Sequence, residues 1–455
     1  MTSSQVPVPD PLPPRLARLA EVLPPSACVD AAGHLQIGGC DLVELARTHG
    51  TPLFVYDEAA IEHRCDEFTL AFAEAPGRLE GRIAYASKAF SCPALLRIVA
   101  ARGLWLDVST DGELAVALAA GFPPERIVLH GNNKARGELE AARKAGVARV
   151  VVDSFDDIDN LSSVVAADGG PPQQVFVRLT PGVDADTHEY IRTGHEESKF
   201  GLGWSNGQAL EAVKLLTERS ATDLTGVHCH IGSQIFDLDG FREAARALVQ
   251  FAVEASAIAG HPVCELDLGG GLGIAYTEGE RPVSVAEWIT TLTGVVAEAA
   301  AAGGLADPVV YVEPGRALVG RAGVTLYTVG TIKHIPGVRT YVAVDGGMSD
   351  NPRPALYGAA YETILADRPQ AARDLVADLA GKHCESSDVL ATDTRLPVDV
   401  RAGDVLVTPA TGAYGYSMAS NYNLVGRPGV VFVRDGEARV VIRREGIDDV
   451  MRLML

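Results

Sequence analysis

Hydrophobic positions between about Thr51 and Gly315 follow a repeating order along the chain. Short runs rich in β-branched residues alternate with Ala- and Leu-rich segments whose apolar residues recur with a helical period. This alternation predicts repeated βα units and a parallel sheet. The expected strands begin near residues 82, 104, 126, 149, 174, 224, 264 and 309. Eight strands of this kind predict a closed (β/α)8 barrel.

Several segments between these strands carry helix start and stop signals. Residues 111–121 (DGELAVALAAG) begin with Asp111, which suits an N-cap, and end with a glycine, which suits a C-cap. Residues 138–146 (ELEAARKAG) end in the same way. Residues 297–304 (AEAAAAGG) are low in complexity and are interpreted as the end of an Ala-rich outer helix.

The pattern changes after Arg316 to alternating strands without helical partners. The strand patterns lie at residues 324–335, 340–347, 404–412 and 430–444, and the last has Asp435-Gly436 at a hairpin turn. Residues 34–39 (HLQIGG) can add a strand to this part. We therefore expect an α/β protein with a barrel over residues 51–317. Residues 318–455, with a contribution from residues 1–50, would form a second, mostly antiparallel β domain.

Composition and charge narrow the possible partners. The formal net charge of −20 argues against nucleic acids and anionic membranes, because both favour a basic protein face. The seven cysteines are scattered without a CxxC pair, which indicates free thiols in a reducing compartment. The Pro-rich start of the chain lacks the apolar core of a signal peptide, and no apolar run has the length of a membrane span. We therefore expect a cytoplasmic enzyme.

Reactive residue types follow the predicted strands at their C-terminal ends, where barrel enzymes carry their chemistry. They are Lys88, Asp107, Ser109, His130, Arg178, His230, Ser233, Gly269 to Gly271, Glu313 and Arg316. A barrel that needed only stability would end its strands in turn-forming residues, so this end is interpreted as a functional site. The alternative is a set of capping residues and satisfied polar groups.

Two of these residues suit a cofactor with an aldehyde and a pyridine ring. Lys88, in YASKAF, follows a buried strand, where a partly desolvated amine can lose its proton and form a Schiff base. Alone, such a lysine is more often a surface residue. A carboxylate such as Glu313, in EPGR, can hold a pyridine nitrogen protonated. Alternatively, Glu313 forms a structural ion pair with Arg316.

A glycine-rich segment suits a phosphate group. Ser233 lies in HCHIGSQ, and the next strand ends in DLGGGLG, with Gly269 and Gly271. Glycines let backbone N–H groups approach a ligand closely, and the serine hydroxyl adds a donor. A tight turn is the structural alternative. A dinucleotide fingerprint is disfavoured because Ile274 breaks the GxGxxG spacing and no acidic ribose partner is evident downstream.

Cys384 lies among acids in KHCESSD, next to Glu385 and near Asp388. Nearby negative charge keeps a thiol protonated, which suits a proton donor better than a nucleophile. The alternative is a small buried apolar residue.

Taken together, these motifs resemble the fold-type III pyridoxal-phosphate (PLP) dependent decarboxylases, which share the alanine-racemase-like fold. This group includes the ornithine, arginine and diaminopimelate decarboxylases, and the last are the most similar. The resemblance runs from TPLFVYD at Thr51 to the hairpin ending at Arg444. The motifs that carry it occur in the expected order: YASKAF, HCHIGSQ, DLGGGLG, VEPGR, VDGGMSDNPRPALYG, HCES and TGAY.

The resemblance implies a role for each matching residue. Lys88 would bind the PLP aldehyde, His230 would stack on the ring, and Glu313 would face the pyridine nitrogen. The other residues expected to hold the phosphate and the ring are Ser233, Gly271, Pro314, Gly315, Arg316 and Tyr414. No metal is implied. A head-to-tail homodimer is implied in which Cys384 and Glu385 complete the partner's site, so a monomer would lack a complete one.

The substrate is indicated by fewer residues. In the diaminopimelate decarboxylases the DNPRPALYG segment supplies an arginine and a tyrosine, here Arg353 and Tyr357. A guanidinium suits a distal carboxylate, and Arg316 and Tyr414 would assist. Glu385 would meet the distal ammonium of the same group. The family commonly has CESGD or CESCD, whereas Ser387 stands at the variable place here, from which we expect a small change in loop packing.

The implied reaction is decarboxylation at the D-configured centre of meso-2,6-diaminopimelate, which gives L-lysine and CO2 in the last step of lysine biosynthesis. Cys384 would protonate the carbon that loses its carboxylate. One alternative is a related decarboxylase acting on ornithine, arginine or lysine. Another is a binding protein that keeps the fold without the cofactor, against which the set of Lys88, His230, Glu313 and Cys384 argues.

Overall fold

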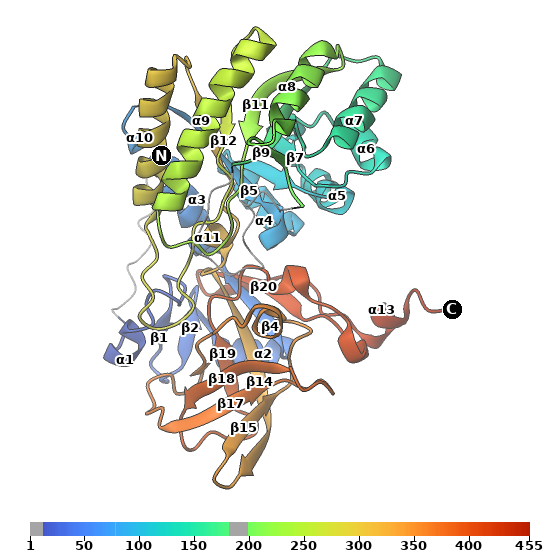
Figure 1. Ribbon diagram of the computed structural model, residues 1–455. Helices are drawn as coiled ribbons and strands as arrows, with labels where there is room; N and C mark the ends of the chain where they lie inside the picture. The colour runs from blue at the N-terminus through green and yellow to red at the C-terminus, as the bar shows by residue number, and fades with distance from the viewer. Residues whose placement is uncertain (1–11, 78, 182–198) are drawn as a thin grey trace. The chain divides into compact units, whose positions relative to one another are not determined.

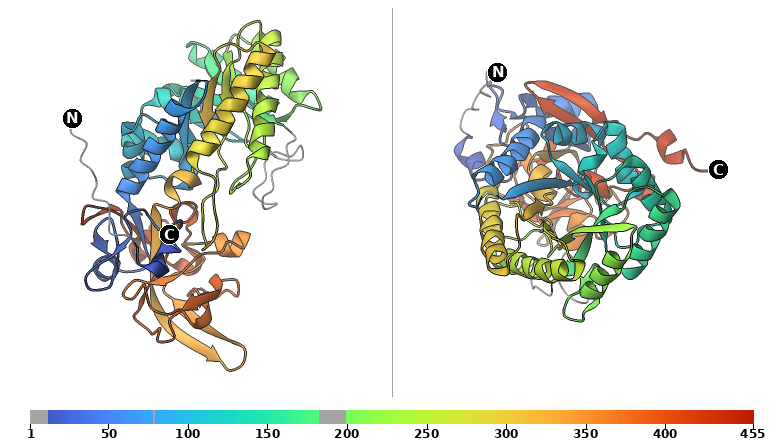
Figure 2. Two further views of the ribbon diagram at one scale, coloured as in Figure 1. Left: turned by 90° about the vertical axis from the view of Figure 1, so that its left-hand side faces the viewer. Right: turned by 90° about the horizontal axis from the view of Figure 1, so that it is seen from above.

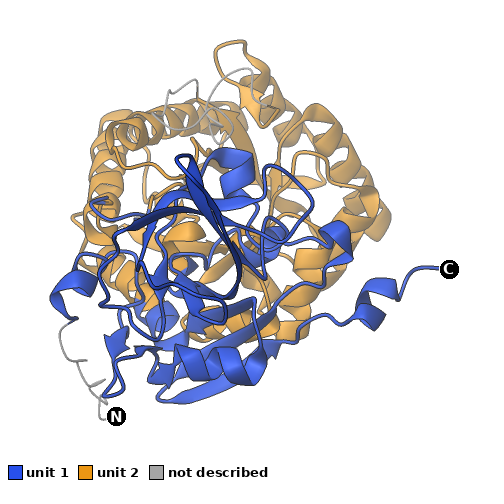
Figure 3. Ribbon diagram, turned by 90° about the horizontal axis from the view of Figure 1, so that it is seen from below, with its two compact units in different colours: residues 1–63, 274–281, 319–455 blue, residues 64–273, 282–318 orange. Residues whose placement is uncertain are grey.

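The chain forms two compact units in the computed structural model, which describes residues 12–77, 79–181 and 199–455. The barrel unit comprises residues 64–273 and 282–318, and the β unit comprises residues 1–63, 274–281 and 319–455 (Figure 3). The first eleven residues, within the segment expected to lack a signal peptide, lie outside the described part of the chain. Among the described residues, no helix is both long and apolar enough to cross a membrane.

The barrel unit contains the eight predicted parallel strands (Figure 1). They are β5 (Glu80–Ala86), β6 (Trp105–Val108), β7 (Ile127–Leu129), β8 (Arg149–Val152), β9 (Gln173–Thr180), β11 (Thr222–His228), β12 (Glu265–Asp267) and β13 (Val309–Val312). The sheet closes because β8 pairs with β9 and β13 pairs with β5. A short strand, β10 (Leu202–Gly203), also pairs with β9. The predicted barrel is therefore confirmed.

Helices surround the barrel strands, as the view from above shows (Figure 2). They are α4 (Pro93–Ala101), α5 (Asp111–Ala120), α6 (Arg136–Ala145), α7 (Phe155–Asp168), α8 (Gln208–Glu218), α9 (Asp239–Ala259) and α10 (Val285–Gly303). Helices α5, α6 and α10 end at glycines with left-handed backbone, as predicted for the first two and as suits the end of the Ala-rich helix.

The predicted N-cap of α5 is wrong by one residue. Thr110 caps the helix, because its hydroxyl accepts a hydrogen bond from the backbone N–H of Glu113. Asp111 is the first helical residue instead. Its negative charge is still favourable there, since the N-terminal end of a helix carries a partial positive charge.

An ion network fills the end of the barrel where the strands begin. Glu265, the first residue of β12, lies 2.9 Å from Arg82 Nη1 and 2.6 Å from Arg149 Nε. It also accepts hydrogen bonds from the hydroxyls of Thr225, at 3.0 Å, and Tyr311, at 3.3 Å. The network ties together β5, β8, β11, β12 and β13 at the end opposite the predicted site.

Removal of the Glu265 carboxylate is expected to destabilise the barrel unit. In Glu265→Ala, the guanidinium groups of Arg82 and Arg149 lose their shared counter-charge, which costs about 3 kcal/mol. Glu265→Gln keeps the shape and one accepting oxygen, so it should cost less. The measurement is the urea midpoint of each variant, followed by circular dichroism. A midpoint for Glu265→Ala equal to that of the wild type would contradict the network's role.

The same network predicts a dependence of stability on pH. Burial alone would raise the pKa of Glu265, but the hydrogen bond and charge of Arg149, with the charge of Arg82, outweigh it and lower the pKa. Because the pKa is lower in the folded state, the stabilisation is complete above the unfolded glutamate pKa and is lost as pH falls through the folded value. Acidification should therefore lower the wild-type midpoint more than that of Glu265→Gln.

The β unit is built on a mixed but mostly antiparallel sheet. Its strands are β4 (Leu53–Asp57), β14 (Gly323–Ile335), β15 (Arg339–Val344), β16 (Ile364–Leu365), β17 (Leu375–Ala380), β18 (Val389–Leu396), β19 (Val405–Thr408), β20 (Gly429–Arg434) and β21 (Glu437–Ile442). Only the pairs β4–β20 and β15–β17 in this sheet are parallel among the described strands. The predicted hairpin is confirmed, since β20 and β21 are joined at Asp435 and Gly436, both with positive φ.

The division between the units differs from the expected one at residue 51. Strand β4 pairs with β14 and β20, so residues 53–57 belong to the sheet of the β unit. Residues 274–281 also group with the β unit. Five consecutive buried residues in β4 are typical of a strand covered on both faces, which explains why its sequence resembles that of a barrel strand.

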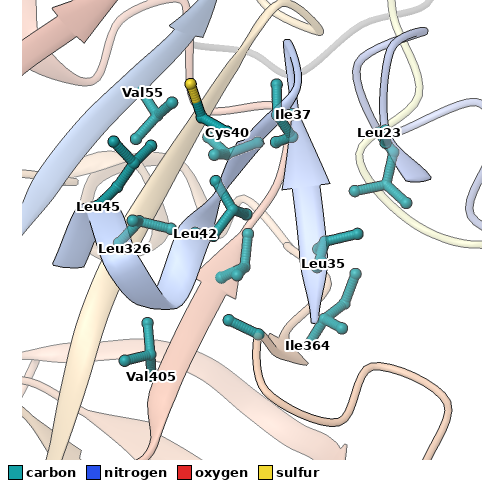
Figure 4. Packing of buried hydrophobic residues seen from close by; sticks show 14 of the residues in the cluster. Leu23, Leu35, Ile37, Cys40, Leu42, Leu45, Val55, Leu326, Ile364 and Val405 are labelled. Atoms are coloured by element: carbon teal, nitrogen blue, oxygen red, sulfur yellow. The ribbon is translucent and has the colours of Figure 1, made fainter. Parts of the chain in front are cut away.

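The strand expected in HLQIGG exists but lies in a separate small sheet. Strand β2 (Leu35–Ile37) pairs with β1 (Cys28–Val29) and β3 (Cys40–Asp41), and is followed by α2 (Leu42–His49). Leu35, Leu42 and other apolar side chains of this N-terminal part join a buried cluster with residues such as Leu326 and Val405 (Figure 4). The N-terminal segment therefore contributes to the core of the β unit. None of the seven cysteines, which all lie in the described part of the chain, forms a disulfide bond.

Candidate active site

The C-terminal ends of the barrel strands gather a set of polar side chains, all of them buried except Lys88. Lys88 lies in a 3-10 turn directly after β5, and Asp107 lies in β6. His228 and Asp267 are the last residues of β11 and β12. His130 and Glu313 follow β7 and β13 directly. Because the strands are parallel and the barrel is closed, these ends meet at one mouth.

Lys88 is oriented by Asp107. Its Nζ lies 3.3 Å from Asp107 Oδ2, and the Asp107 side chain is 1% exposed. The lysine side chain is 45% exposed, so the amine is open to a ligand while its position is set by a buried charge. The sequence analysis expected a partly desolvated amine, and the structure shows a half-exposed one held by an ion pair.

Glu313 is held by two histidines. His130 Nε2 lies 2.7 Å from Glu313 Oε1, and His228 Nε2 forms a hydrogen bond of 3.3 Å with Glu313 Oε2. The two imidazole rings pack edge to face, with centroids 4.9 Å apart. His130 Nε2 also lies 3.8 Å from Asp107 Oδ1, so close contacts lead from Lys88 through Asp107 and His130 to Glu313.

The histidines keep Glu313 ionised. Burial would raise the pKa of Glu313, but its electrostatic interactions and hydrogen bonds with the imidazoles of His130 and His228 outweigh it and hold the pKa well below its ordinary value. Burial lowers the pKa of His228 to about 4, against the opposing effect of Glu313. A neutral His228 therefore faces an ionised Glu313 at neutral pH. The ion pair of Glu313 with Arg316, the structural alternative to a role at a pyridine nitrogen, is not among the ion pairs of the described residues.

The glycine-rich segment after β12 comes close to two neighbouring strand ends. A Cβ atom on Gly270 would lie 2.2 Å from the carbonyl oxygen of Glu313, and one on Gly271 would lie 2.7 Å from that of Gly232. Gly271 also has a positive φ of 113°. Only glycine fits at these places, so the segment lies closer to its neighbours than side chains would permit.

Arg316 and Ser233 meet beside this glycine segment. Arg316 donates from Nη2 to Ser233 Oγ at 2.9 Å, and 6% of Arg316 is exposed. The side chain of His230 accepts a hydrogen bond from the backbone N–H of Gly270, at 3.2 Å. Burial, followed by the charges of Lys88 and Arg178, lowers the pKa of His230 well below its ordinary value. His230 is therefore a neutral ring in a positively charged surrounding.

Two other residues of the expected set have structural contacts. Arg178 lies 3.4 Å from Asp153, and Asp153 also accepts from the backbone N–H of Gly201. Ser109 donates its backbone N–H to the Glu113 carboxylate at 2.6 Å. For these two positions the structure agrees with the alternative of satisfied polar groups.

The remaining predicted residues lie in the β unit. Arg353 begins helix α12 (Arg353–Tyr357), and its guanidinium lies over the Tyr276 ring, 4.6 Å from the centroid. It also donates a hydrogen bond to the hydroxyl of Tyr361. Arg353 is 6% exposed, and among the described residues no Asp or Glu forms an ion pair with it. Tyr357 ends the helix half-buried.

Tyr414 adopts a left-handed backbone conformation in TGAY. Its φ is 58°, which a residue with a large side chain rarely adopts. Burial would lower the pKa of Arg353, but the neighbouring tyrosines Tyr361, Tyr276 and Tyr414 outweigh it and raise the pKa. Such backbone outliers are concentrated at functional sites. The structure therefore brings Tyr414 and Arg353 together within the β unit.

The loop that carries Cys384 is exposed, and the buried side chain of Asp388 fixes its backbone. Cys384 and Glu385 are both exposed, so the alternative of a small buried apolar cysteine is wrong. The loop is fixed by Asp388, which is 4% exposed and accepts from the backbone N–H groups of His383, at 2.7 Å, and Met348, at 2.6 Å. Asp388 thus sets the backbone of the loop, while Ser387 is exposed at its tip.

The residues that surround Glu313 are not recognisable as a group from the sequence. The motifs predict Asp107 and His130 at strand ends without a role, and they predict no role for His228 or Asp267. A usable signal was present, because each of these residues lies at or next to the last position of a barrel strand. Whether a side chain at such a position points into the barrel or away from it depends on the residue at which the strand ends. The sequence defines that residue only to within one or two positions.

Comparison with known proteins identifies the family. Residues 58–320 match the model of the pyridoxal-binding domain of pyridoxal-dependent decarboxylases. The chain belongs to the pyridoxal-dependent decarboxylase family. It is an enzyme, and its cofactor is pyridoxal 5′-phosphate, as the sequence analysis expected.

Relatives within this family cover nearly the whole chain. The diaminopimelate decarboxylase of Bacillus subtilis is 49% identical over 93% of this chain and 95% of its own length. That of Mycobacterium bovis is 47% identical over 95% and 97%. The diaminopimelate decarboxylase of M. jannaschii, solved in complex with L-lysine, has a TM-score of 0.87 at 34% identity, covering 94% of this chain and 98% of its own.

The mouth of the barrel fits the family's cofactor. It offers an amine at Lys88, an ionised carboxylate at Glu313, and a glycine segment beside the guanidinium of Arg316. An aldehyde, a ring nitrogen and a phosphate need these three kinds of group. The residues present therefore agree with the cofactor that the family binds.

Proposed function

We propose that this protein is a diaminopimelate decarboxylase, which converts meso-2,6-diaminopimelate to L-lysine and CO2 in the last step of lysine biosynthesis. The relatives of 47–49% identity bear this name, and solved relatives carry L-lysine. The motifs that support the proposal are distributed over both units, from Lys88 to Tyr414.

The observation that carries the choice of substrate is the environment of Arg353. A buried guanidinium is costly unless a counter-charge or several acceptors satisfy it. Among the described residues, Arg353 has aromatic rings and a tyrosine hydroxyl around it and no carboxylate ion pair. This is the arrangement expected of a residue that receives the distal carboxylate of a ligand, as diaminopimelate has and ornithine, arginine and lysine lack.

Bound pyridoxal phosphate supplies an electron-withdrawing ring that accepts the electron pair left behind when the substrate carboxylate departs as CO2. Lys88 binds the cofactor covalently through Nζ, and Asp107 orients that amine. Glu313 would face the ring nitrogen, where its negative charge would favour the protonated ring. His230 would lie against the face of the ring, because a neutral imidazole can pack there without adding charge.

The glycine-rich segment after β12, with Ser233 and Arg316 beside it, would hold the phosphate. Gly271 and Ser233 provide backbone and hydroxyl donors, and Arg316 adds a positive charge fixed by Ser233. Pro314 and Gly315 shape the turn between Glu313 and Arg316, where a Cβ on Gly315 would lie 3.0 Å from that of Ala89. Tyr414 completes the set of cofactor and substrate contacts.

The proposed substrate contacts place one group at each end of the molecule. Arg353, with Tyr357, Arg316 and Tyr414, receives the distal carboxylate, and Glu385 receives the distal ammonium. Cys384 then delivers a proton from Sγ to the carbon that has lost its carboxylate. Its exposure supports this role, since a thiol on a loop held by Asp388 can meet a substrate without rearrangement of the core.

We propose a head-to-tail homodimer in which Cys384 and Glu385 act in the partner's site. The support is the position of both residues on an exposed loop of the β unit, whereas Lys88 and Glu313 lie in the barrel unit. Seven free cysteines support a cytoplasmic location, since thiols persist in a reducing compartment.

The test of the function is an assay of CO2 release with added pyridoxal phosphate. The purified enzyme is given meso-diaminopimelate, ornithine, arginine or lysine at equal concentration. Release from meso-diaminopimelate alone, with L-lysine as the product, is expected. A higher kcat/KM for ornithine, arginine or lysine would overturn the proposed substrate and keep the reaction class.

Replacement of Arg353 tests the substrate contact directly. Arg353→Ala should raise KM for diaminopimelate about ten- to a hundredfold, because the charge-assisted hydrogen bonds to the distal carboxylate are lost. Arg353→Lys keeps the positive charge, so its KM should lie between that of the wild type and that of Arg353→Ala. The control is Arg395→Ala, an exposed arginine of the same unit. An unchanged KM in a folded Arg353→Ala enzyme would contradict the contact.

A further inference from the structure

Asp267 lies directly beside Glu313 and is completely buried. It is the last residue of β12, which pairs with β13, the strand that leads to Glu313. The nitrogen and oxygen atoms that Asp267, Glu313, His130 and His228 offer all lie within 4.8 Å of one another. Two carboxyl groups therefore share one buried space with two imidazole rings.

The hydrogen bonds of the two carboxyl groups are unequal. Glu313 has a histidine Nε2 at each oxygen. Asp267 Oδ1 accepts from the backbone N–H of Gly269 at 2.9 Å. Its other oxygen, Oδ2, is buried and receives no donor of suitable geometry from the described residues; the same is true of Glu313 Oε1, although His130 Nε2 lies 2.7 Å from it. A negative charge on Asp267 would face the negative charge of Glu313 with one backbone donor to compensate it.

One proton placed on Asp267 resolves this conflict. Like charges at such short range cannot both persist away from water, so the carboxyl group with the weaker donors takes the proton. Burial, followed by the charge of Glu313, raises the pKa of Asp267 well above its ordinary value, while that of Glu313 is lowered. The two shifts agree with the geometry.

We propose that Asp267 is a positioning residue that acts as a neutral carboxylic acid and donates its proton in a hydrogen bond to Glu313. The inference rests on the proposed role of Glu313 at the ring nitrogen. With Asp267 neutral, the pair carries a single negative charge, which balances the single positive charge of a protonated pyridine ring. The three donors around Glu313 also make it a weaker base, so the proton stays on the ring.

Asparagine is the matched substitution. In Asp267→Asn, the amide oxygen can accept from Gly269 N–H and the amide NH2 can donate to Glu313, which reproduces the pattern of a protonated aspartate. Asp267→Ala removes the donor and leaves a cavity. Glu265→Gln is the control, because Glu265 lies on the same strand two residues earlier and is ionised between Arg82 and Arg149.

Three readouts apply to the purified enzyme with pyridoxal phosphate. The first is the dissociation constant of the cofactor, the second the pH dependence of its absorption, and the third the infrared band of a protonated carboxylic acid. Asp267→Asn should keep the dissociation constant within about threefold of wild type and keep the pH profile, since a hydrogen bond of similar kind is retained. Its infrared difference from wild type should show the loss of one protonated carboxyl group.

Asp267→Ala should raise the dissociation constant about ten- to a hundredfold and shift the absorption profile, because a hydrogen bond to a charged group is lost. Glu265→Gln should lower stability and leave the profile unchanged. An Asp267→Asn enzyme that behaves like Asp267→Ala, or the absence of the infrared band in wild type, would overturn the inference.

These outcomes are separate from those of the proposed function. A wild-type enzyme that fails to bind pyridoxal phosphate or to release CO2 from diaminopimelate would overturn the function. A wild-type enzyme that does both, with an ionised Asp267, would overturn the inference alone. Stoichiometric metal in the wild-type protein, lost in Asp267→Asn, would also overturn it, since the four side chains would then be ligands.

Discussion

Lys88→Ala is expected to lower kcat for CO2 release from diaminopimelate by about a thousandfold or more, because it removes the amine that binds the cofactor covalently. The half-exposed lysine side chain contributes little to the core, but its ammonium compensates the buried Asp107 carboxylate 3.3 Å away. Lys88→Arg is therefore the companion variant. Its guanidinium keeps the positive charge beside Asp107 but cannot form the covalent bond that the amine forms with the cofactor. Both variants are expected to be inactive.

Mass spectrometry tests the covalent attachment independently of turnover. After borohydride reduction, the wild type should carry the mass of the cofactor on the peptide that contains Lys88, and both variants should lack it. The control is Lys144→Ala, an exposed lysine near the end of α6. Full activity of a folded Lys88→Ala or Lys88→Arg enzyme, or cofactor mass on another lysine of the wild type, would contradict the assignment.

Cys384→Ala is expected to lower kcat about a hundredfold, because the loss of a positioned general acid typically costs two to four orders of magnitude. Cofactor binding should stay unchanged, since Cys384 lies in the β unit on a loop fixed by Asp388 rather than by its own side chain. Cys384→Ser should be nearly as slow, because a hydroxyl is a much weaker acid than a thiol.

The matched control is Cys28→Ala, a partly exposed cysteine of the same unit. It should keep the wild-type kcat and unfolding midpoint. If Cys384→Ala also turns over at the wild-type rate, the proton comes from another donor, and the role of the HCESSD loop must be assigned again. If Cys384→Ala loses its cofactor, the loop contributes to binding rather than to proton transfer.

Most of the barrel could be predicted from the sequence. Most of the eight strands are short runs with β-branched residues that are followed by a helix, and local patterns of this kind are strong where a strand is buried on both faces. The hairpin at Asp435 and Gly436 was equally clear. Strand β4 was assigned to the wrong part, because its five buried residues look like a barrel strand and its partners, β14 and β20, lie far along the chain.

The candidate site was predicted in part. Lys88, Glu313 and the glycine segment were recognisable because their residue types follow strand ends in a known order of motifs. The two histidines that hold Glu313 were not, since the contact joins β7, β11 and β13, which are separated by many residues. The role of Asp267 was not recognisable either. Its proposed neutral state depends on whether the two histidines contact Asp267 or Glu313.

The amino-acid sequence by itself determined the barrel, the second β domain, the family and the residue types at each strand end, because these depend on local periodicity and on motif order. Only the tertiary structure decided which side chains share a buried space, and hence which carboxyl group is ionised. The physical reason is that charge states in a protein interior depend on distances of a few ångströms between residues from different strands, and such distances arise only when the sheet closes.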